Sequence, residues 1–268
     1  MEPTRIAYKA FTAVFLLAAS AAPALAVEPL SPLILNARYI ISWSGITLGR
    51  INVTAREDAG SYSLIVDTKT HGVGAIVSDE ASIVRAEGTK NAAGDYVPVS
   101  YHAGPQGKKS GTNTTLNYDA KGLIATRTRD PEDDPAWRPP VTFEQIDTAH
   151  DPITASFMLR RMLYAAQQKS DASVATRTYD GARLAEMRMT RTINARVPVM
   201  DGYKDAVNVV VTRTPIEGYT PKELKKFKKG DPEIHLYFTN DAAFLPIRAS
   251  ARIEFGELAL TMVDDNTQ

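Results

Sequence analysis

The chain has 268 residues, with 31 basic and 31 acidic side chains and no cysteine. This charge balance gives no global attraction to nucleic acid, so a nucleic-acid partner is not expected. Without cysteine, the chain can form no disulfide, carry no lipid-modified cysteine and supply no thiolate to a metal. The length suits one sizeable hydrophobic core or two small ones.

Residues 1–26 have the features of a cleaved signal peptide. A basic start precedes the apolar stretch AFTAVFLLAA at 10–19, and the small-x-small pattern ALA stands at 24–26. The alternative is an uncleaved N-terminal anchor. The apolar stretch has only about ten residues, whereas a membrane-spanning helix needs about 20. We therefore expect a mature chain that begins at Val27, is periplasmic and soluble, is not a lipoprotein, and has no transmembrane span.

The stretch from Ala37 to Glu57 alternates apolar and polar residues, as a half-buried strand does. The pattern breaks at Ser44-Gly45, where a tight turn or sharp bend is expected because glycine reaches backbone angles closed to its neighbours. Gly49 indicates a bulge or a close packing contact. Two strands, or one strongly bent ribbon, are predicted, each with one apolar face. The side chains assigned to these faces are Tyr39, Ile41 and Trp43 before the turn, and Ile51, Val53 and Ala55 after it.

Similar stretches predict about a dozen strands in all, joined mostly by short turns. Short turns imply antiparallel neighbours, because parallel strands need long crossover connections. The further stretches lie at 62–67, 82–87, 96–102, 112–118, 123–129, 173–179, 184–192, 206–214, 234–239, 244–253 and 258–263.

The segment PITASFMLRRMLYAAQ predicts a helix at 152–167. Asp151 is a good N-cap, and Pro152 suits the first helical position. Apolar residues cover most of the helix circumference, so the helix should be largely buried. Arg160 and Arg161 are expected at the rim, where their stems can pack and their charges stay in water.

A proline-rich crossing at 130–150 precedes the helix and is too rich in proline for a central strand. We interpret it as a long connection from the edge of the sheet to the helix, of the kind that is often functional or mobile. The predicted fold is mainly β: a strongly curved antiparallel sheet, or half-open barrel, packed on one long apolar helix. A single β-rich domain over 27–268 is preferred, and two β subdomains are the alternative.

Four short motifs occur in an order that resembles a known family. They are Tyr39-x-Ile41-x-Trp43-x-Gly45-Ile46-x-Leu48-Gly49, then Asp151-Pro152-Ile153-x-Ala155, then Tyr179-Asp180-Gly181-Ala182-Arg183-Leu184, and finally Leu245-Pro246-Ile247-Arg248 with Phe255-Gly256-x-Leu258. Over 37–263 the chain resembles the exported bacterial proteins grouped as domain of unknown function 3108. The resemblance implies an exported β-rich protein and brings no catalytic residues. The predicted architecture is also similar to that of periplasmic lipoprotein carriers, which by itself says nothing of function.

Aromatic residues are the candidate contacts for a ligand. Trp43, Phe157 and Tyr164 are assigned to a groove between the sheet and the helix, with the crossing at 130–150 as its lid. The alternative is that such aromatic side chains simply form the core.

The segment PKELKKFKKGDPE is the strongest local concentration of charge. It holds Lys222, Lys225, Lys226, Lys228 and Lys229, with two apolar residues among them. This pattern predicts a patch for anionic lipid headgroups or cell-wall polymers. The alternative is a solvated excursion before the next strand.

No motif predicts catalysis or metal binding. The histidines His71, His102, His150 and His235 lack metal-ligand spacing, and neither GxSxG nor a phosphate-binding glycine loop occurs. No catalytic residue, metal or cofactor is therefore predicted, and a hydrolase is disfavoured. The leading hypothesis is a non-catalytic periplasmic protein that binds or carries an apolar or amphipathic cell-envelope molecule, such as a lipid. The alternative is a structural or assembly factor of the envelope that acts through protein–protein contacts.

Overall fold

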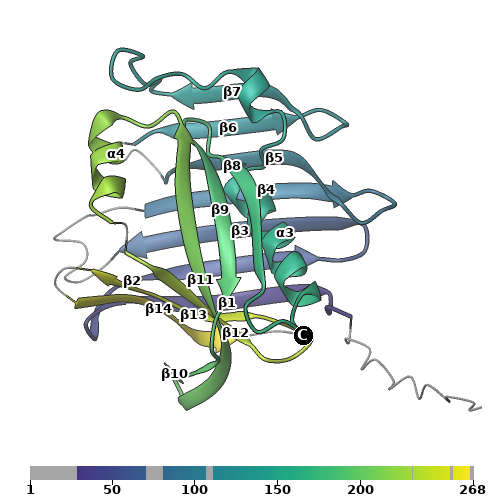
Figure 1. The fold of residues 1–268 in the computed structure, drawn as a ribbon, viewed down its shortest axis with the longest axis vertical. Helices are drawn as coiled ribbons and strands as arrows, with labels where there is room; N and C mark the ends of the chain where they lie inside the picture. Colours follow the sequence, from purple (N-terminus) through teal and green to yellow (C-terminus); the bar gives the residue numbers. More distant parts are fainter. Residues whose placement is uncertain (1–28, 71–80, 107–110, 231, 254–255, 266–268) are drawn as a thin grey trace, which may run out of the picture.

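The computed structural model describes residues 29–70, 81–106, 111–230, 232–253 and 256–265. The predicted signal peptide at 1–26 lies outside the described residues. Within them the chain forms 14 strands and three helices (Figure 1). The strands are β1 (Leu33–Trp43), β2 (Ile46–Glu57), β3 (Ser61–Thr70), β4 (Ala81–Lys90), β5 (Tyr96–Pro105), β6 (Asn113–Tyr118), β7 (Ile124–Asp130), β8 (Ser173–Tyr179), β9 (Leu184–Arg191), β10 (Ala195–Val199), β11 (Gly202–Glu217), β12 (Ile234–Thr239), β13 (Pro246–Ile253) and β14 (Gly256–Asp265). The helices are α2 (Phe143–Ile146), α3 (Pro152–Ala165) and α4 (Pro221–Lys228).

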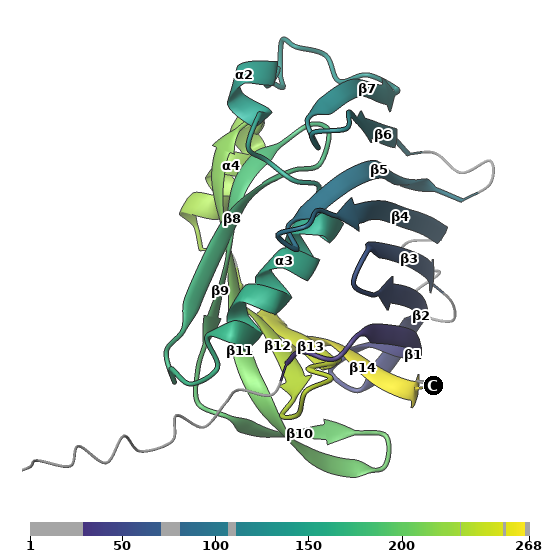
Figure 2. The same ribbon diagram turned by 90° about the vertical axis from the view of Figure 1, so that its right-hand side faces the viewer.

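All the strands belong to one antiparallel sheet. Its order is β7-β6-β5-β4-β3-β2-β1-β14-β13-β12-β11-β9-β8, and β10 pairs with β11. The edge strands β7 and β8 do not pair with each other in the described part of the chain, so the sheet is open. Figure 2 shows it curling around α3. The prediction of a mainly β protein with a large antiparallel sheet is confirmed.

The hairpin between β1 and β2 lies at the predicted break in the alternating pattern. Ser44 and Gly45 have φ angles of 45° and 87°. Two successive positive φ angles are those of a type I′ turn, whose twist matches the strands it joins. The register of the pair shifts just after Ile41, which faces Gly49. The two predicted strands and the bulge beside Gly49 are therefore both present.

Helix α3 lies inside the curve of the sheet, and two of its sides pack against different parts of the sheet (Figure 2). One side of the helix places Phe157 in a cluster with β1, β2, β3 and β5. The other side places Leu159, Leu163 and Tyr164 against β9, β11 and β12. The helix therefore covers the apolar faces of two walls that are far apart along the sheet.

The expectation of one long apolar helix is not supported, because the helices are short. Helix α3 has 14 residues and ends at Ala165. The lysine-rich segment forms α4, with 8 residues, and the crossing contains α2, with 4 residues. Strand β10 is present in the structure but was not predicted from the sequence. It contains Pro198, which is tolerated because β10 pairs only with β11. No helix in the described ranges is long and apolar enough to cross a membrane.

Candidate functional site

An apolar groove lies between α3 and the concave face of the sheet. Its volume is about 310 Å³, at the small end of the range of about 300–1,000 Å³ that is usual for ligand pockets. Helix α3 lines it with Ile153, Ser156, Phe157 and Arg160. These positions are spaced i, i+3, i+4 and i+7, so they share one face of the helix.

The opposite wall of the groove comes from the inward faces of β1, β2 and β3. In β1, burial alternates along the strand and turns Leu33, Leu35 and Tyr39 inward. Val53 of β2 pairs with Val66 of β3, and both line the groove while remaining only half buried. Strands β9 and β12–β14 complete the lining. The alternation that makes these strands half-apolar thus places an uncovered apolar surface inside the curve.

Phe157 forms one wall of this groove and is itself only 3% exposed. Its ring centroid lies 5.2 Å from that of Tyr62 and 6.2 Å from that of Tyr96. Aromatic pairs at such distances add to the stability that burial provides. Phe157 therefore joins α3 to β3 and β5 and separates the groove from the core behind it.

Arg160 is buried beside the groove and holds a turn of the sheet. Its Nη1 lies 3.1 Å from Oε2 of Glu57. Its Nη2 donates to the carbonyl of Ala243 at 2.5 Å, and Nε donates to the carbonyl of Phe244 at 3.1 Å. Burial lowers the pKa of Arg160, and the Glu57 carboxylate opposes this shift. The prediction that Arg160 stays in water at the rim is wrong, because it lies on the helix face that meets the sheet; Arg161 is exposed.

Glu57 is the centre of the buried network to which Arg160 belongs. It is 5% exposed at the end of β2. Its Oε1 accepts hydrogen bonds from Nζ of Lys90, at 2.8 Å, and from the hydroxyl of Tyr96. The carboxylate thus joins β2, β4, β5 and α3. Breaking a buried ion pair costs much more than breaking an exposed one, because the remaining charge stays desolvated.

Asp151 begins α3 and anchors a second buried chain of hydrogen bonds. Its Oδ1 accepts the backbone N–H groups of Ile153 and Thr154, so the predicted N-cap is present. Its Oδ2 accepts the Thr154 hydroxyl at 2.6 Å. Since that single proton is used, the hydroxyl of Tyr62, 2.8 Å away, donates to Thr154 Oγ1. Burial raises the pKa of Asp151, and the hydrogen bonds from Thr154 oppose the shift.

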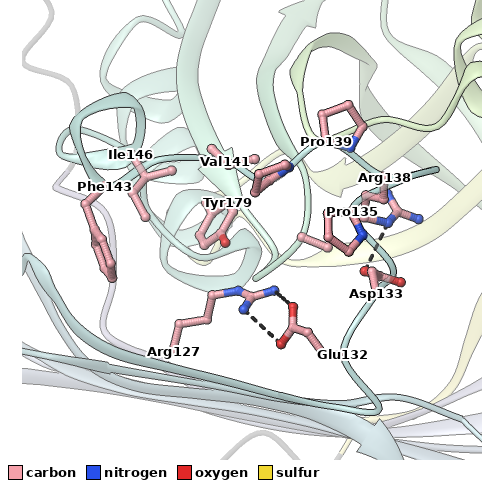
Figure 3. Close-up of a pocket in the computed structure, with 12 residues that line it drawn as sticks. Arg127, Glu132, Asp133, Pro135, Arg138, Pro139, Val141, Phe143, Ile146 and Tyr179 are labelled. Atoms are coloured by element: carbon pink, nitrogen blue, oxygen red, sulfur yellow. Dashed lines mark hydrogen bonds and ion pairs between the residues drawn. The ribbon is translucent and has the colours of Figure 1, made fainter.

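A second pocket, of about 380 Å³, lies under the proline-rich crossing (Figure 3). On one side, Arg127 of β7 binds both carboxylate oxygens of Glu132, at 3.1 and 2.6 Å. Its Nε donates to the carbonyl of Gly181 at 2.5 Å. Val141, Ile146 and several prolines form the apolar part of the lining. These contacts tie the crossing to β7 and to the turn between β8 and β9.

Arg138 ties the same crossing to helix α4. Its Nη1 donates to the carbonyl of Gly218 at 2.6 Å and to Glu223 at 3.1 Å. Its Nε lies 3.0 Å from Oδ2 of Asp133, without the alignment of a hydrogen bond. The charged groups that line the second pocket are thus paired with one another. We interpret the residues around the pocket as the contacts that attach the crossing to the neighbouring elements of the fold.

Glu223 fixes α4 to the rest of the molecule. It forms a capping box with Thr220 and also binds Nη2 of Arg183, at 2.8 Å. Partial burial alone would raise the pKa of Glu223. The hydrogen bonds from Thr220 and Arg138 and the charge of Arg183 outweigh burial and lower the pKa to about 2. The Thr-Pro-x-Glu sequence at the start of α4 is a local helix signal that the expectation of a loop overlooked.

The structure does not bring the three predicted ligand residues together. Phe157 lines the groove, whereas Tyr164 packs on another side of α3, with its ring 5.5 Å from that of Phe244. Trp43 ends β1 at the hairpin turn and is 36% exposed. The crossing at 130–150 lines the second pocket and not the groove, so it is not the lid that was expected.

The five predicted patch lysines do lie together. Helix α4 and its C-cap carry Lys222, Lys225, Lys226, Lys228 and Lys229, and all five side chains are exposed.

Two of the three described histidines contact a polar side chain on a neighbouring strand. His102 and His235 each place Nδ1 3.1 Å from a side-chain oxygen on a neighbouring strand, of Thr115 and Asn208 respectively. Burial lowers the pKa of His150. His71 lies outside the described residues. Within the described ranges, no group of three or more His, Cys, Asp or Glu side chains could hold a metal ion.

The fold and the groove define a class of protein: an open antiparallel half-barrel with a helix and an apolar groove inside its curve. The chain belongs to the family described as "Protein of unknown function (DUF3108)", whose model matches residues 38–263. The resemblance seen in the sequence motifs is therefore confirmed at the level of the family.

One solved structure aligned with this chain is a crystal structure of a β-barrel-like protein of domain of unknown function DUF1849 from Brucella abortus. The alignment has a TM-score of 0.47 and 10% sequence identity, and it covers 90% of this chain and 99% of that chain. No curated protein matches the chain.

Proposed function

We propose that the protein is a non-catalytic periplasmic carrier that binds an apolar or amphipathic molecule of the cell envelope, such as a lipid, in the groove beside α3. One observation carries the proposal. The inward faces of β2 and β3 carry half-buried apolar side chains, among them Val53, Leu64 and Val66, that line an open space beside α3. Apolar surface left open in this way favours an apolar ligand that removes it from water.

Of the two arginines that line the groove, Arg248 is the one suited to holding a headgroup. Arg160 is fully engaged by Glu57 and two carbonyl groups. Arg248 also lines the groove and binds Thr261 and Glu257, at 2.6 and 2.5 Å. The side chain of Glu257 is 50% exposed, so an acidic headgroup could replace it on Arg248. An amphiphile with one chain and an acidic head is therefore the ligand that we expect.

The test uses a fatty acid with a terminal dansyl group, whose emission rises in an apolar site. Val53→Phe with Val66→Phe places two rings in the groove and should weaken binding at least about tenfold. The matched control is Thr54→Phe with Ile65→Phe. Those two residues pair with each other in the same strands but are exposed on the outer face. The control should bind as the unchanged protein does.

Failure of the unchanged protein to bind the probe, or equal binding by both variants, would overturn the proposal. Native mass spectrometry of protein purified from its own cells gives a second test. A retained amphiphile supports the carrier. A stoichiometric protein partner, with the groove empty, would favour the alternative of an assembly factor that acts through protein–protein contacts.

A further inference from the structure

Helix α4 is held to the rest of the molecule at its N-terminal end. Pro221 is at the first helical turn, and Thr220 and Glu223 close the capping box. Arg138 and Arg183 bind Glu223 from two other parts of the chain. Figures 1 and 2 show α4 at the end of the molecule opposite β10, and in Figure 2 it lies on the side of β8, away from β6 and β7. None of its residues lines the groove beside α3.

The two faces of α4 differ in character. Phe227 is turned toward the protein, with its ring 5.4 Å from that of Tyr219 and the Arg213 guanidinium 5.0 Å above it. At about 100° per residue, four of the lysines lie within an arc of about 100° on the other face. These four are Lys222, Lys225, Lys226 and Lys229, and all are exposed. Among the described residues, none of the four forms an ion pair.

An exposed apolar side chain, Trp137, lies beside this lysine face and is 48% exposed. Leu224 of α4 is 39% exposed but lies about 150° around the helix from the centre of the lysine face. Trp137 lies close to α4, because the guanidinium of Arg138 is 5.2 Å from the Trp137 ring centroid and also binds Glu223. Lysines beside an exposed tryptophan are a combination found at the surface of a bilayer, where the charges meet phosphates and the aromatic ring enters the headgroup region.

We propose that the lysine face of α4, with Trp137 at its border, docks on the surface of an anionic phospholipid bilayer. Charge complementarity selects the phosphate-rich surface, and the apolar border selects a bilayer over a water-soluble polyanion. This inference stands on α4 and does not depend on the groove. Each lysine near an anionic surface should strengthen binding about fivefold, and added salt should weaken it.

The experiment uses the two tryptophans of the chain. Trp43→Phe leaves Trp137 as the single reporter. With vesicles of equal parts phosphatidylglycerol and phosphatidylcholine, its emission should shift to shorter wavelength, and brominated lipid should quench it. Vesicles of phosphatidylcholine alone should produce neither change. An unshifted Trp137 in protein that sediments with the vesicles would overturn the proposed orientation.

Changing the four lysines of the face to glutamine should weaken vesicle binding at least about 100-fold. A control with the same change in net charge replaces four exposed lysines elsewhere, namely Lys69, Lys121, Lys169 and Lys204. Thermal melts should show both variants folded, because the capping box is kept. Equal loss in both variants would overturn the proposal. So would binding to dextran sulfate that equals or exceeds binding to the vesicles.

Discussion

Replacing Phe157 with alanine tests whether α3 is held inside the curve of the sheet. The ring is 3% exposed and packs against those of Tyr62 and Tyr96. A buried aromatic side chain covers about 150–250 Å². At about 25 cal/mol/Å², this area corresponds to about 4–6 kcal/mol before the methyl group of alanine is subtracted. Loss of the two ring contacts adds to the cost, because each aromatic pair contributes about 0.5–1.5 kcal/mol.

The groove reduces the effect of this change. Phe157 borders open space on one side, so fewer neighbouring atoms lose contacts when the ring is removed. We therefore expect Phe157→Ala to lower the free energy of unfolding by about 3–4 kcal/mol, in the lower half of the usual range of about 3–5 kcal/mol.

Urea unfolding followed by far-ultraviolet circular dichroism measures this difference. Phe143→Ala is the matched control, because the Phe143 ring is 60% exposed. Its effect should be within about 0.5 kcal/mol of zero. If Phe157→Ala were as neutral as Phe143→Ala, α3 would lie on the surface, and the groove beside it would not exist as described.

Two further predictions concern buried or partly buried ion pairs, and one concerns the signal peptide. Arg160→Met should lower the free energy of unfolding by about 3 kcal/mol, since Glu57 stays buried and only partly paired; in a double-mutant cycle with Glu57→Gln the two costs should not add. Glu223, with its pKa lowered to about 2, stabilises the fold above the pKa of the unfolded carboxyl, near 4.5. That contribution is lost as the pH falls toward 2, so Glu223→Gln should be less stable at neutral pH and should lose less stability on acidification in a urea titration series. N-terminal sequencing of the exported protein should find Val27 first, and a chain that still begins at Met1 in the membrane fraction would contradict the signal-peptide prediction.

Local sequence determined the features whose geometry depends on near neighbours. The hairpin at Ser44-Gly45 follows from the break in the alternating pattern and from Gly45, which reaches positive φ without strain. The start of α3 follows from the Asp151 carboxylate, which reaches N–H groups two and three residues ahead. The inward faces of the strands follow from the alternation of apolar and polar residues alone. The apolar pattern of the predicted helix likewise placed Phe157 among the buried residues. Helix α4 also has a local signal, the capping box that begins at Thr220.

Only the tertiary structure decided where the charges and the cavities lie. Arg160 was expected in water because a charged side chain is usually exposed. It is buried because the curled sheet brings Glu57, 103 residues away, within 3.1 Å of it. In the same way, Arg138 meets Glu223 across 85 residues, and the crossing covers the second pocket instead of the groove. Turns and caps are set by backbone angles over a few residues. The pairing of distant charges and the space left beside a helix depend on how far the whole sheet curls, and no short stretch of sequence encodes that.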